Sequence, residues 1–416
     1  MTDKFNKLQY SPSFFDTAQD IIGGLPIKLI DKWLESEQTQ EDALNLIEEY
    51  KTKGYSVSSD SVGLTKLTKQ KGLIEILAII NHPKEIVHSY GRAIGGEGVG
   101  IWAADNTQMF YPETVKAETL LSTLLTVQDE IKKTCQIEIG IGAHFGEFYY
   151  INGGLYGIEA DAIEDIAEND TEGGEIAISA GIYNLLPPNH QFVIEKKSDH
   201  PTLIGDIFRV LDGPRLANLQ PGNNKYPIPY SEDFYADLVT YQHRLDDTKL
   251  GHHLADKYIM KKVVLLIERE TKKIEFNHLS VLNNISISTI LKDLGMRLLS
   301  QNKGVEIKVV GNLGIYVFDD AVAAINFAKL IRSELVKQDL SCKIGIDIGP
   351  VLIFDLPCGG KDIAGMPVNI ASKMAQDKGR LGKLYLSAAM KEFVDLTEFT
   401  ELQYTISGVE ITAYEG

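Results

Sequence analysis

The chain has 416 residues, of which 44% are hydrophobic and 24% charged, and its formal net charge is −17. This composition excludes a largely disordered chain, and the negative charge disfavours nucleic acid or an anionic membrane as partners. Three scattered cysteines do not support a disulfide framework or a zinc cluster. There is neither a bilayer-long apolar stretch nor a signal-peptide core. We therefore expect a soluble, cytoplasmic protein of several domains.

Helical periodicity dominates residues 1–53. Apolar positions recur at helical spacing over 16–34 and 41–50, and Gly23–Pro26 interrupts the first run. From residue 54 onward, short β-branched or aromatic runs alternate with longer amphipathic ones. This alternation predicts an α/β or α+β arrangement after an N-terminal helical segment.

Two parts of the chain repeat the same motifs in the same order, which indicates two diverged copies of one domain. The matching pairs are Gly95–Trp102 with Val310–Val317, Ile141–Phe148 with Ile344–Val351, and Gly174–Ala180 with Gly382–Ala388. We place the copies at 54–212 and 261–416. The segment between them, 213–260, begins rich in Pro and Asn and then turns helical from Ser231 to Arg244, so it is a long linker with structure of its own.

Short motifs in both copies resemble those of the class III nucleotide cyclases, and adenylyl cyclases in particular. In the first copy, Asp60 precedes a glycine turn as in the first metal-binding signature, and 94–98 resembles the hairpin with the second metal carboxylate. In the second copy, 307–312 is similar to the strand with the base-selecting lysine, and 362–374 to the base-recognition strand and the helix after it. The resemblance implies an α+β fold of two ferredoxin-like cyclase homology domains in a pseudo-twofold intramolecular dimer.

The resemblance also implies a composite site that converts ATP to cyclic AMP and pyrophosphate. Asp60 and Glu97 would hold two Mg²⁺ or Mn²⁺ ions, which lower the pKa of the attacking 3′-hydroxyl and clamp the attacking and leaving oxygens. The backbone amides of the glycine turn would face the phosphates. These amides belong to Ser61, Val62, Gly63, Leu64 and Thr65.

The second copy would supply the groups that hold the nucleoside. By the resemblance, Lys308 donates to a ring nitrogen of adenine and Asp362 accepts from its 6-amino group. Asn369 would orient the ribose, and Lys373 stands where the family usually has the transition-state arginine. Lysine keeps the charge but lacks the planar fork of arginine.

The pseudosymmetric second site is expected to be degenerate, which leaves it open to an effector. Its metal positions would carry Glu268 and Asn312. Its nucleotide positions would fall at Ala93, Gly157, Glu164 and Glu168. Two carboxylates four residues apart would repel a triphosphate.

Simpler interpretations stay open for several of these residues. Asp60 would also serve as a turn aspartate, Glu97 as an exposed hairpin residue, and Lys308 as part of a solvated strand face. Glu97 is longer than the usual aspartate, and few basic residues are available for the phosphates. These departures leave a second hypothesis: a catalytically inactive cyclase-fold protein that binds a nucleotide or a protein in signalling. Because the copies are fused, a monomer could complete its own site.

Overall fold

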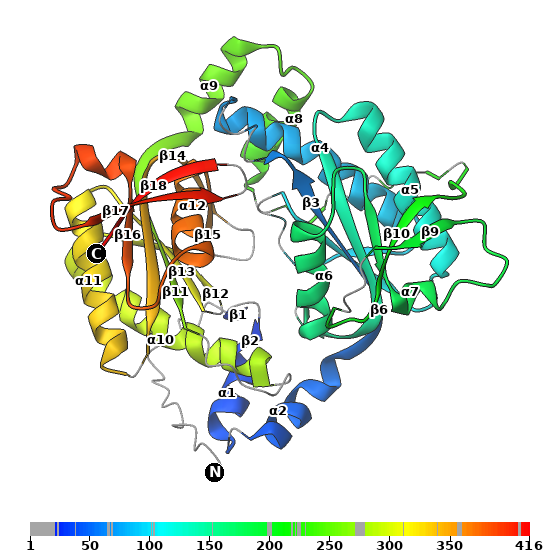
Figure 1. Ribbon diagram of the computed structural model, residues 1–416, viewed down its shortest axis with the longest axis horizontal. Helices are drawn as coiled ribbons and strands as arrows, with labels where there is room; N and C mark the ends of the chain where they lie inside the picture. The colour runs from blue at the N-terminus through cyan, green and yellow to red at the C-terminus, as the bar shows by residue number, and fades with distance from the viewer. Residues whose placement is uncertain are drawn as a thin grey trace. The chain divides into compact units, whose positions relative to one another are not determined.

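The computed structural model describes residues 21–416 except for 23–24, 38, 65–66, 68–69, 101, 103–104, 152, 198–201, 218, 221, 223–225, 229, 271–278, 311, 339, 356–359 and 407–408. The chain divides into two compact units (Figure 1). The first unit is Ile47–Gly251. The second unit is His252–Gly416 together with the described residues up to Leu46.

The first unit is built on a mixed sheet with the strand order β4-β5-β3-β6-β8-β10-β9, and β7 pairs with β6. Only the β6–β8 pair is parallel among the described strands of this sheet. The strands are β3 (Lys51–Val62), β4 (Glu97–Gly98), β5 (Thr107–Pro112), β6 (Glu138–Ile151), β7 (Gly154–Tyr156), β8 (Ile176–Ser179), β9 (Val193–Lys196) and β10 (Ile207–Asp212). The helices are α4 (Leu73–Ala93), α5 (Ala117–Thr134), α6 (Ile158–Asn169), α7 (Ala180–Tyr183), α8 (Glu232–Gln242) and α9 (Thr248–Tyr258), which runs across the boundary between the units.

The second unit repeats this topology, with the strand order β12-β13-β11-β14-β16-β18-β17 and β15 paired with β14. The strands are β11 (Ile259–Arg269), β12 (Val305–Val310), β13 (Leu313–Phe318), β14 (Cys342–Asp355), β15 (Lys361–Ala364), β16 (Leu384–Ser387), β17 (Thr400–Ile406) and β18 (Val409–Glu415). The helices are α10 (Leu279–Asn302), α11 (Ala321–Val336), α12 (Met366–Ser372), a π-helix (Lys373–Asp377) and a 3₁₀-helix (Ala388–Glu392). The predicted α+β repeat is therefore confirmed.

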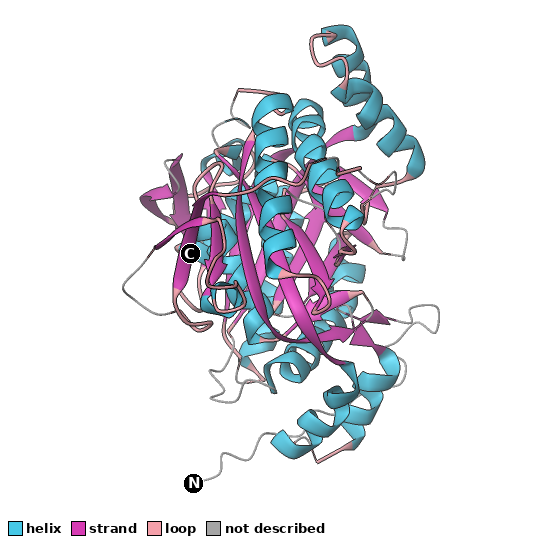
Figure 2. Ribbon diagram, turned by 90° about the vertical axis from the view of Figure 1, so that its right-hand side faces the viewer, coloured by secondary structure: helices cyan, strands magenta, loops and turns pink. Residues whose placement is uncertain are grey.

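Both faces of the central strand β11 are covered, which explains its continuous apolar sequence. Val263, Leu265 and Ile267 pack in one core cluster with side chains of α10 and α11. Val264 and Leu266 pack in another cluster with side chains from α12. Figure 2 distinguishes the helices and strands of the chain by colour. Glu268, the first charged residue after this buried run, therefore lies at the carboxyl end of the strand.

The N-terminal helices are shorter than the sequence predicts. The described part of the chain starts with β1 (Ile21–Ile22), which pairs with β2 (Leu25–Pro26), so the helix expected over 16–34 begins only at α1 (Ile27–Glu35). Residues 16–20 lie outside the described residues. The next helix, α2 (Gln40–Ile47), ends in a 3₁₀ turn (Glu48–Tyr50) directly before β3. The first sheet therefore begins three residues before the predicted boundary at residue 54.

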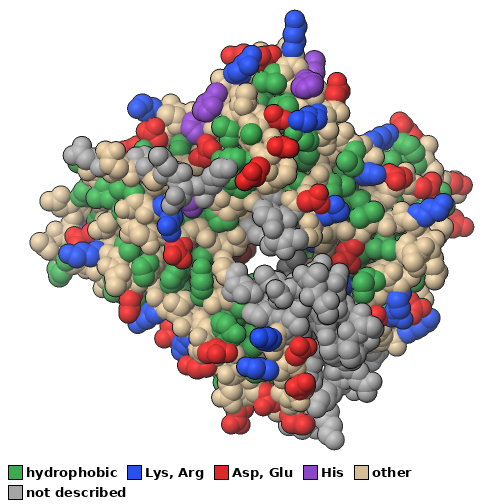
Figure 3. Space-filling view, turned by 180° about the vertical axis from the view of Figure 1, so that it is seen from behind, with side chains coloured by type: hydrophobic (Ala, Val, Ile, Leu, Met, Phe, Trp, Pro, Cys, Tyr) green, Lys and Arg blue, Asp and Glu red, His purple; other side chains and the backbone are tan. Residues whose placement is uncertain are grey.

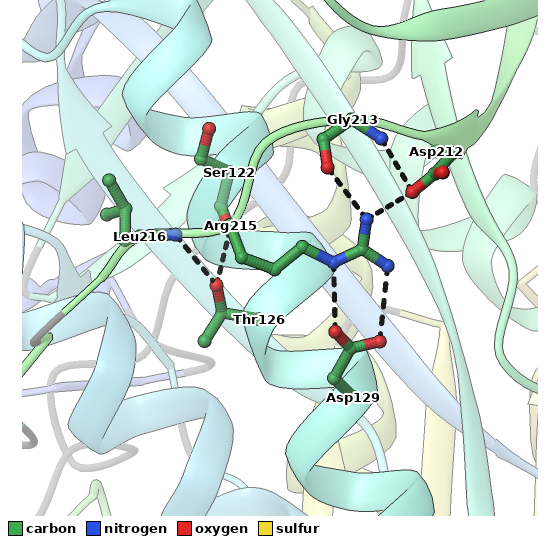
Figure 4. A network of polar contacts seen from close by, with 7 residues as sticks. All are labelled: Ser122, Thr126, Asp129, Asp212, Gly213, Arg215 and Leu216. Atoms are coloured by element: carbon green, nitrogen blue, oxygen red, sulfur yellow. Dashed lines mark hydrogen bonds and ion pairs between the residues drawn. The ribbon is translucent and has the colours of Figure 1, made fainter.

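The segment after β10 is attached to the first unit from its start. The Arg215 guanidinium forms two hydrogen bonds to the Asp129 carboxylate on α5, at 2.9 and 3.3 Å, and the Leu216 amide donates to Thr126 Oγ1 at 3.2 Å (Figure 4). Further along, α8 packs on α4. The Ser231 side chain caps α8 by accepting from the Phe234 amide. The predicted helix at 231–244 is therefore α8, and it belongs to the first unit.

Charged side chains of both signs lie on the face of the molecule that Figure 3 shows. On the face shown in Figure 3, acidic and basic side chains are interspersed, so the net negative charge is not gathered in one patch there. Among the described residues, no helix has both the length and the apolar character that a membrane span requires.

Candidate functional site

Two carboxylates lie together at the end of β3 in the first unit. Asp60 follows the buried run of β3, and its side chain is hydrogen-bonded to that of Asp105, just before β5. The Ser61 backbone amide donates to both carboxyl groups. The strands bring them together because Ser59 pairs with Thr107, two residues after Asp105. A hydrogen bond between two carboxyl groups requires a shared proton, unless a cation replaces it.

The electrostatics of this pair favour a bound cation. Burial, and then the charges of Asp105 and Glu168, raise the pKa of Asp60. Burial also raises the pKa of Asp105, although the Lys84 charge and hydrogen bonds oppose this. Among the described residues, neither aspartate forms an ion pair within 4.0 Å. A divalent cation would relieve both the burial of charge and the mutual repulsion.

Glu97, the predicted second metal ligand, is not brought to Asp60. Glu97 is opposite Phe110, and Phe110 is opposite Ser56. Glu97 is therefore level with a residue four positions before Asp60, roughly 13 Å along the strand at about 3.3 Å per residue, and two strands away. Its half-exposed side chain lies 3.9 Å from Arg92 Nη1 and hydrogen-bonds Tyr150.

Asp105 is the residue that the motif comparison missed. In the second unit, Asn312 lies two residues before Gly314, which pairs with Ile267, just as Asp105 lies two residues before Thr107. The loop before β5 is longer than the one before β13, so matching the glycine-rich hairpins aligned Asn312 with Glu97. Counting back from the strand Thr107–Pro112 would have found Asp105 instead.

The turn after Asp60 has the glycine conformation that the sequence predicts. Gly63 has φ +82°, a conformation that other residues rarely adopt. Ser61 is buried and ends β3 with Val62, which is exposed, Gly63 forms the turn, and Leu64 is the first helical residue after it. Thr65 lies outside the described residues. The Ser61 amide, which the resemblance places facing the phosphates, donates instead to the two aspartates.

The second unit brings together the two predicted base-reading residues. Lys308 Nζ lies 2.7 Å from Asp362 Oδ1, and the Asp362 carboxylate is buried. Oδ1 also accepts a hydrogen bond of 2.8 Å from the Ile363 amide. A register shift between Glu306 and Lys308 in β12 re-aims the lysine relative to a regular strand. The Lys308 side chain keeps about a third of its surface exposed.

Asn369 lies on α12, and Lys373, four residues later, begins the π-helix that continues it. Asn369 is exposed on α12, whose backbone packs closely on β14 at Gly345. Lys373 is the first residue of the π-helix, and its carbonyl accepts from the Lys378 amide at 3.3 Å. Its ammonium lies 4.0 Å from Asp377 Oδ2. A π-turn at this point is typical of functional positions in helices.

In the second unit, the positions that match Asp60 and Asp105 carry an ion pair and an amide in place of two carboxylates. Glu268 and Asn312 occupy the register positions of Asp60 and Asp105, and Asn312 Nδ2 lies 3.5 Å from Glu268 Oε1. Lys343, opposite Glu268 in β14, forms an ion pair with it. The residue opposite Asp60 is Gly140. The Lys343 ammonium therefore neutralises Glu268 in the second unit, whereas Asp60 in the first unit has no lysine opposite it.

The strand register changes which residues of the first unit match Asp362, Asn369 and Lys373 of the second. Gly157 and Gly365 each begin a helix, with φ +115° and +145°. The positions that match Asp362, Asn369 and Lys373 are therefore Gly154, Asp161 and Asp165, rather than Gly157, Glu164 and Glu168. Ala93 ends α4, away from the strand that matches Lys308. The first unit is acidic there in either alignment.

No protein-family model matches the chain, and no curated protein matches its sequence. Among solved structures, a class III adenylyl cyclase-like ATP-binding protein from Pseudomonas aeruginosa aligns with a TM-score of 0.50. The alignment covers 83% of this chain and 85% of that chain at 11% identity. The chain has a class III cyclase-like fold.

Single cyclase domains align with less of this cyclase-like chain. The guanylyl cyclase domain of a RhoGC fusion protein from Blastocladiella emersonii has a TM-score of 0.31 and 16% identity, over 38% of this chain and 96% of that one. An adenylate/guanylate cyclase/hydrolase from Silicibacter pomeroyi has a TM-score of 0.31 and 20% identity, over the same shares. At these identities the likeness concerns the fold alone.

Proposed function

We propose that the chain is an adenylyl cyclase-like enzyme that converts ATP to cyclic AMP and pyrophosphate at one composite site. The observation that carries the proposal is the half-buried Asp60–Asp105 pair, together with its replacement in the other unit by Glu268, Asn312 and an internal lysine. The first unit would hold the metal ions and the second unit the nucleoside. The pseudo-twofold pairing of the units is part of the proposal.

The donor set at Asp60 and Asp105 fits Mg²⁺ or Mn²⁺. Both groups are carboxylates, and hard divalent cations prefer oxygen ligands. Among the described residues no cluster of three or more potential metal-binding side chains occurs. Mg²⁺ commonly binds to one or two carboxylates and completes its shell with water and substrate phosphates. When bound there, the ions would acidify the 3′-hydroxyl and offset charge on the phosphates.

The second unit would orient the nucleotide for in-line attack. The ribose 3′-hydroxyl loses its proton to water, its oxygen forms a bond to the α-phosphorus, and the bond between that phosphorus and the pyrophosphate oxygen breaks. Asn369 would hold the ribose so that this oxygen faces the α-phosphorus, and the Lys373 ammonium would stabilise the negative charge that develops there.

Base choice would come from Lys308 and Asp362. The lysine donates to a ring nitrogen, and the buried carboxylate accepts from the 6-amino group of adenine. Guanine has a carbonyl oxygen at that position, which would face the carboxylate and be repelled.

Replacing Asp362 by alanine is expected to reduce the preference for ATP over GTP by about tenfold to 100-fold, because a hydrogen bond to a charged group is worth about 1.5–3 kcal/mol. Calorimetric titration of each nucleotide measures this preference. The matched control is Asp355→Ala, an exposed carboxylate at the end of the neighbouring strand, paired with Lys361. A preference that Asp362→Ala leaves unchanged would refute the base assignment.

The direct test of the proposed activity is cyclic AMP formation by the purified chain with Mn²⁺ and ATP. Asp60→Ala is expected to reduce product formation to background, because one of the two metal carboxylates is lost. Wild-type product no higher than that of this variant would reject the enzyme.

A second candidate is a nucleotide-binding protein without turnover. It is favoured by Lys373, which lacks the fork of an arginine, and by the Pseudomonas neighbour, which is described as a cyclase-like ATP-binding protein. ATP binding without cyclic AMP in the same assay would support it.

A further inference from the structure

The segment that follows the first sheet is docked on α4 by a continuous chain of hydrogen bonds. We call residues 226–242 the docked segment. The Tyr226 hydroxyl donates to Asn81 Oδ1, and Asn81 Nδ2 donates to Gln242 Oε1 at 2.6 Å. Gln242 Nε2 and the Tyr235 hydroxyl both donate to the Glu85 carboxylate, at 2.9 and 2.8 Å. Tyr226 is thus fixed by its hydroxyl on the helix.

The ring of Tyr226 holds Trp102, which lies three residues before Asp105. The two rings stack with centroids 5.4 Å apart and an angle of 14° between their planes. The Trp102 backbone amide donates to Pro227 O at 3.4 Å, and its indole Nε1 donates to Val99 O at 2.9 Å. Trp102 is 2% exposed. The docked segment therefore contacts the loop that carries Asp105 through both a ring and a backbone group.

Lys84 holds the same tryptophan from α4. Its side chain is 1% exposed, and Nζ donates to the Trp102 carbonyl at 2.9 Å. Nζ also lies 5.8 Å from the centre of the Tyr226 ring and attracts the Asp105 carboxylate. A buried ammonium is costly unless it is hydrogen-bonded and faces negative charge. A carbonyl, a ring face and the Asp105 carboxylate compensate for this burial only in part, because burial still lowers the pKa of Lys84 to about 7.

We propose that Tyr226 and Lys84 are positioning residues that clamp Trp102, so that the docked segment sets the affinity of the Asp60–Asp105 pair for a divalent cation. This inference rests on the proposed metal site. The affinity of a site for its metal depends on the groups that orient the metal-binding side chains. Changes to such groups typically weaken metal binding by about 10-fold to 100-fold. Because coupling is reciprocal, a bound cation stabilises the docked segment in return.

The test is a titration of the full chain with Mn²⁺ alone, followed by the spin-resonance signal of free Mn²⁺. Tyr226→Ala removes the stacked ring and is expected to weaken binding about tenfold, whereas Tyr226→Phe keeps the ring, loses only the hydrogen bond to Asn81, and is expected to weaken binding less than Tyr226→Ala. Tyr241→Ala is the matched control, because it removes another buried tyrosine of the docked segment that has no described contact with Trp102. It is expected to stay within about twofold of wild type.

Hydrogen exchange at the Trp102 amide gives a second measurement that needs no metal. Tyr226→Ala is expected to accelerate exchange there, and Mn²⁺ is expected to slow exchange within the docked segment of the wild type. If Tyr226→Ala does not fold, Tyr226→Leu replaces it, because leucine keeps an apolar side chain but offers no ring to stack.

The outcomes separate this inference from the proposed function. A wild-type chain that does not bind Mn²⁺ overturns the metal site and the coupling together. A wild-type chain that binds Mn²⁺ while Tyr226→Ala binds it equally well overturns the coupling alone. Equal weakening by Tyr226→Ala and Tyr241→Ala does the same, because the loss would then reflect general destabilisation.

Discussion

Asp105→Asn is expected to lower cyclic AMP formation at least about 100-fold, which is the loss typical when a preorganised electrostatic group is removed from an active site. The amide cannot carry the negative charge that Asp105 presents beside Asp60, so the pair loses its capacity to hold two divalent cations. Product formation with Mn²⁺ and ATP measures the loss. Glu97→Gln is the control and is expected to stay within about threefold of wild type, since Glu97 lies on the edge strand beside Arg92.

The same variant is expected to have the opposite effect on the stability of the metal-free protein. Burial raises the pKa of both aspartates, so ionising them costs the folded state free energy. The stability that the protonated carboxyl groups contribute is fully present below the ordinary pKa of an aspartate. It is lost as the pH rises through their raised pKa values. Asp105→Asn removes one of the two charges and should flatten this fall and raise the melting temperature near neutral pH.

Thermal unfolding with and without Mn²⁺ measures both effects. The wild type should gain a higher melting temperature from the cation, and Asp105→Asn should gain little. If Glu97→Gln lost the Mn²⁺ effect and Asp105→Asn kept it, the assignment of the carboxylate pair would be refuted.

Lys373→Ala is expected to lower kcat by about 100-fold while the KM for ATP changes only a few-fold. The proposed role of this ammonium is to stabilise charge that develops at the α-phosphate, which a neutral methyl group cannot do. Lys373→Arg keeps the charge and adds a planar fork, so it should retain or exceed wild-type kcat. Steady-state rates with Mn²⁺ and ATP measure these changes.

Lys378→Ala is the matched control for Lys373, because Lys378 is an exposed lysine just after the same π-helix. It is expected to leave kcat unchanged. A loss of kcat in the control as large as that in Lys373→Ala would show that net charge on this helix matters and that no specific contact is made. An Lys373→Ala protein with wild-type kcat would remove Lys373 from the transition state.

The two units show how one scaffold gives opposite electrostatics at the same position. In the first unit, Asp60 is opposite Gly140, which has no side chain to neutralise it. In the second unit, Glu268 is opposite Lys343, which forms an ion pair with it, and Asn312 replaces the second carboxylate. The second unit therefore satisfies its acidic group internally, whereas the two half-buried carboxylates of the first unit face each other without such a lysine opposite Asp60.

The resemblance to the cyclases linked Lys308 with Asp362, and the sequence alone determined the repeat, the α+β class and Asp60 at the end of a strand. These features depend on local order: apolar periodicity, a glycine turn after a strand, and motifs that recur in the same sequence. The residues involved lie within regular elements, where spacing along the chain fixes which face a side chain occupies.

Only the tertiary structure decided that Asp105, and not Glu97, accompanies Asp60, and that Trp102 stacks on Tyr226. The loop between β4 and β5 has no period of its own, and the register of β5 with β3, from which Asp105 can be counted back, is fixed only in the folded sheet. The contact between Trp102 and Tyr226 joins residues more than a hundred positions apart. Such contacts form because the docked segment buries its aromatic rings against α4, which no local pattern encodes.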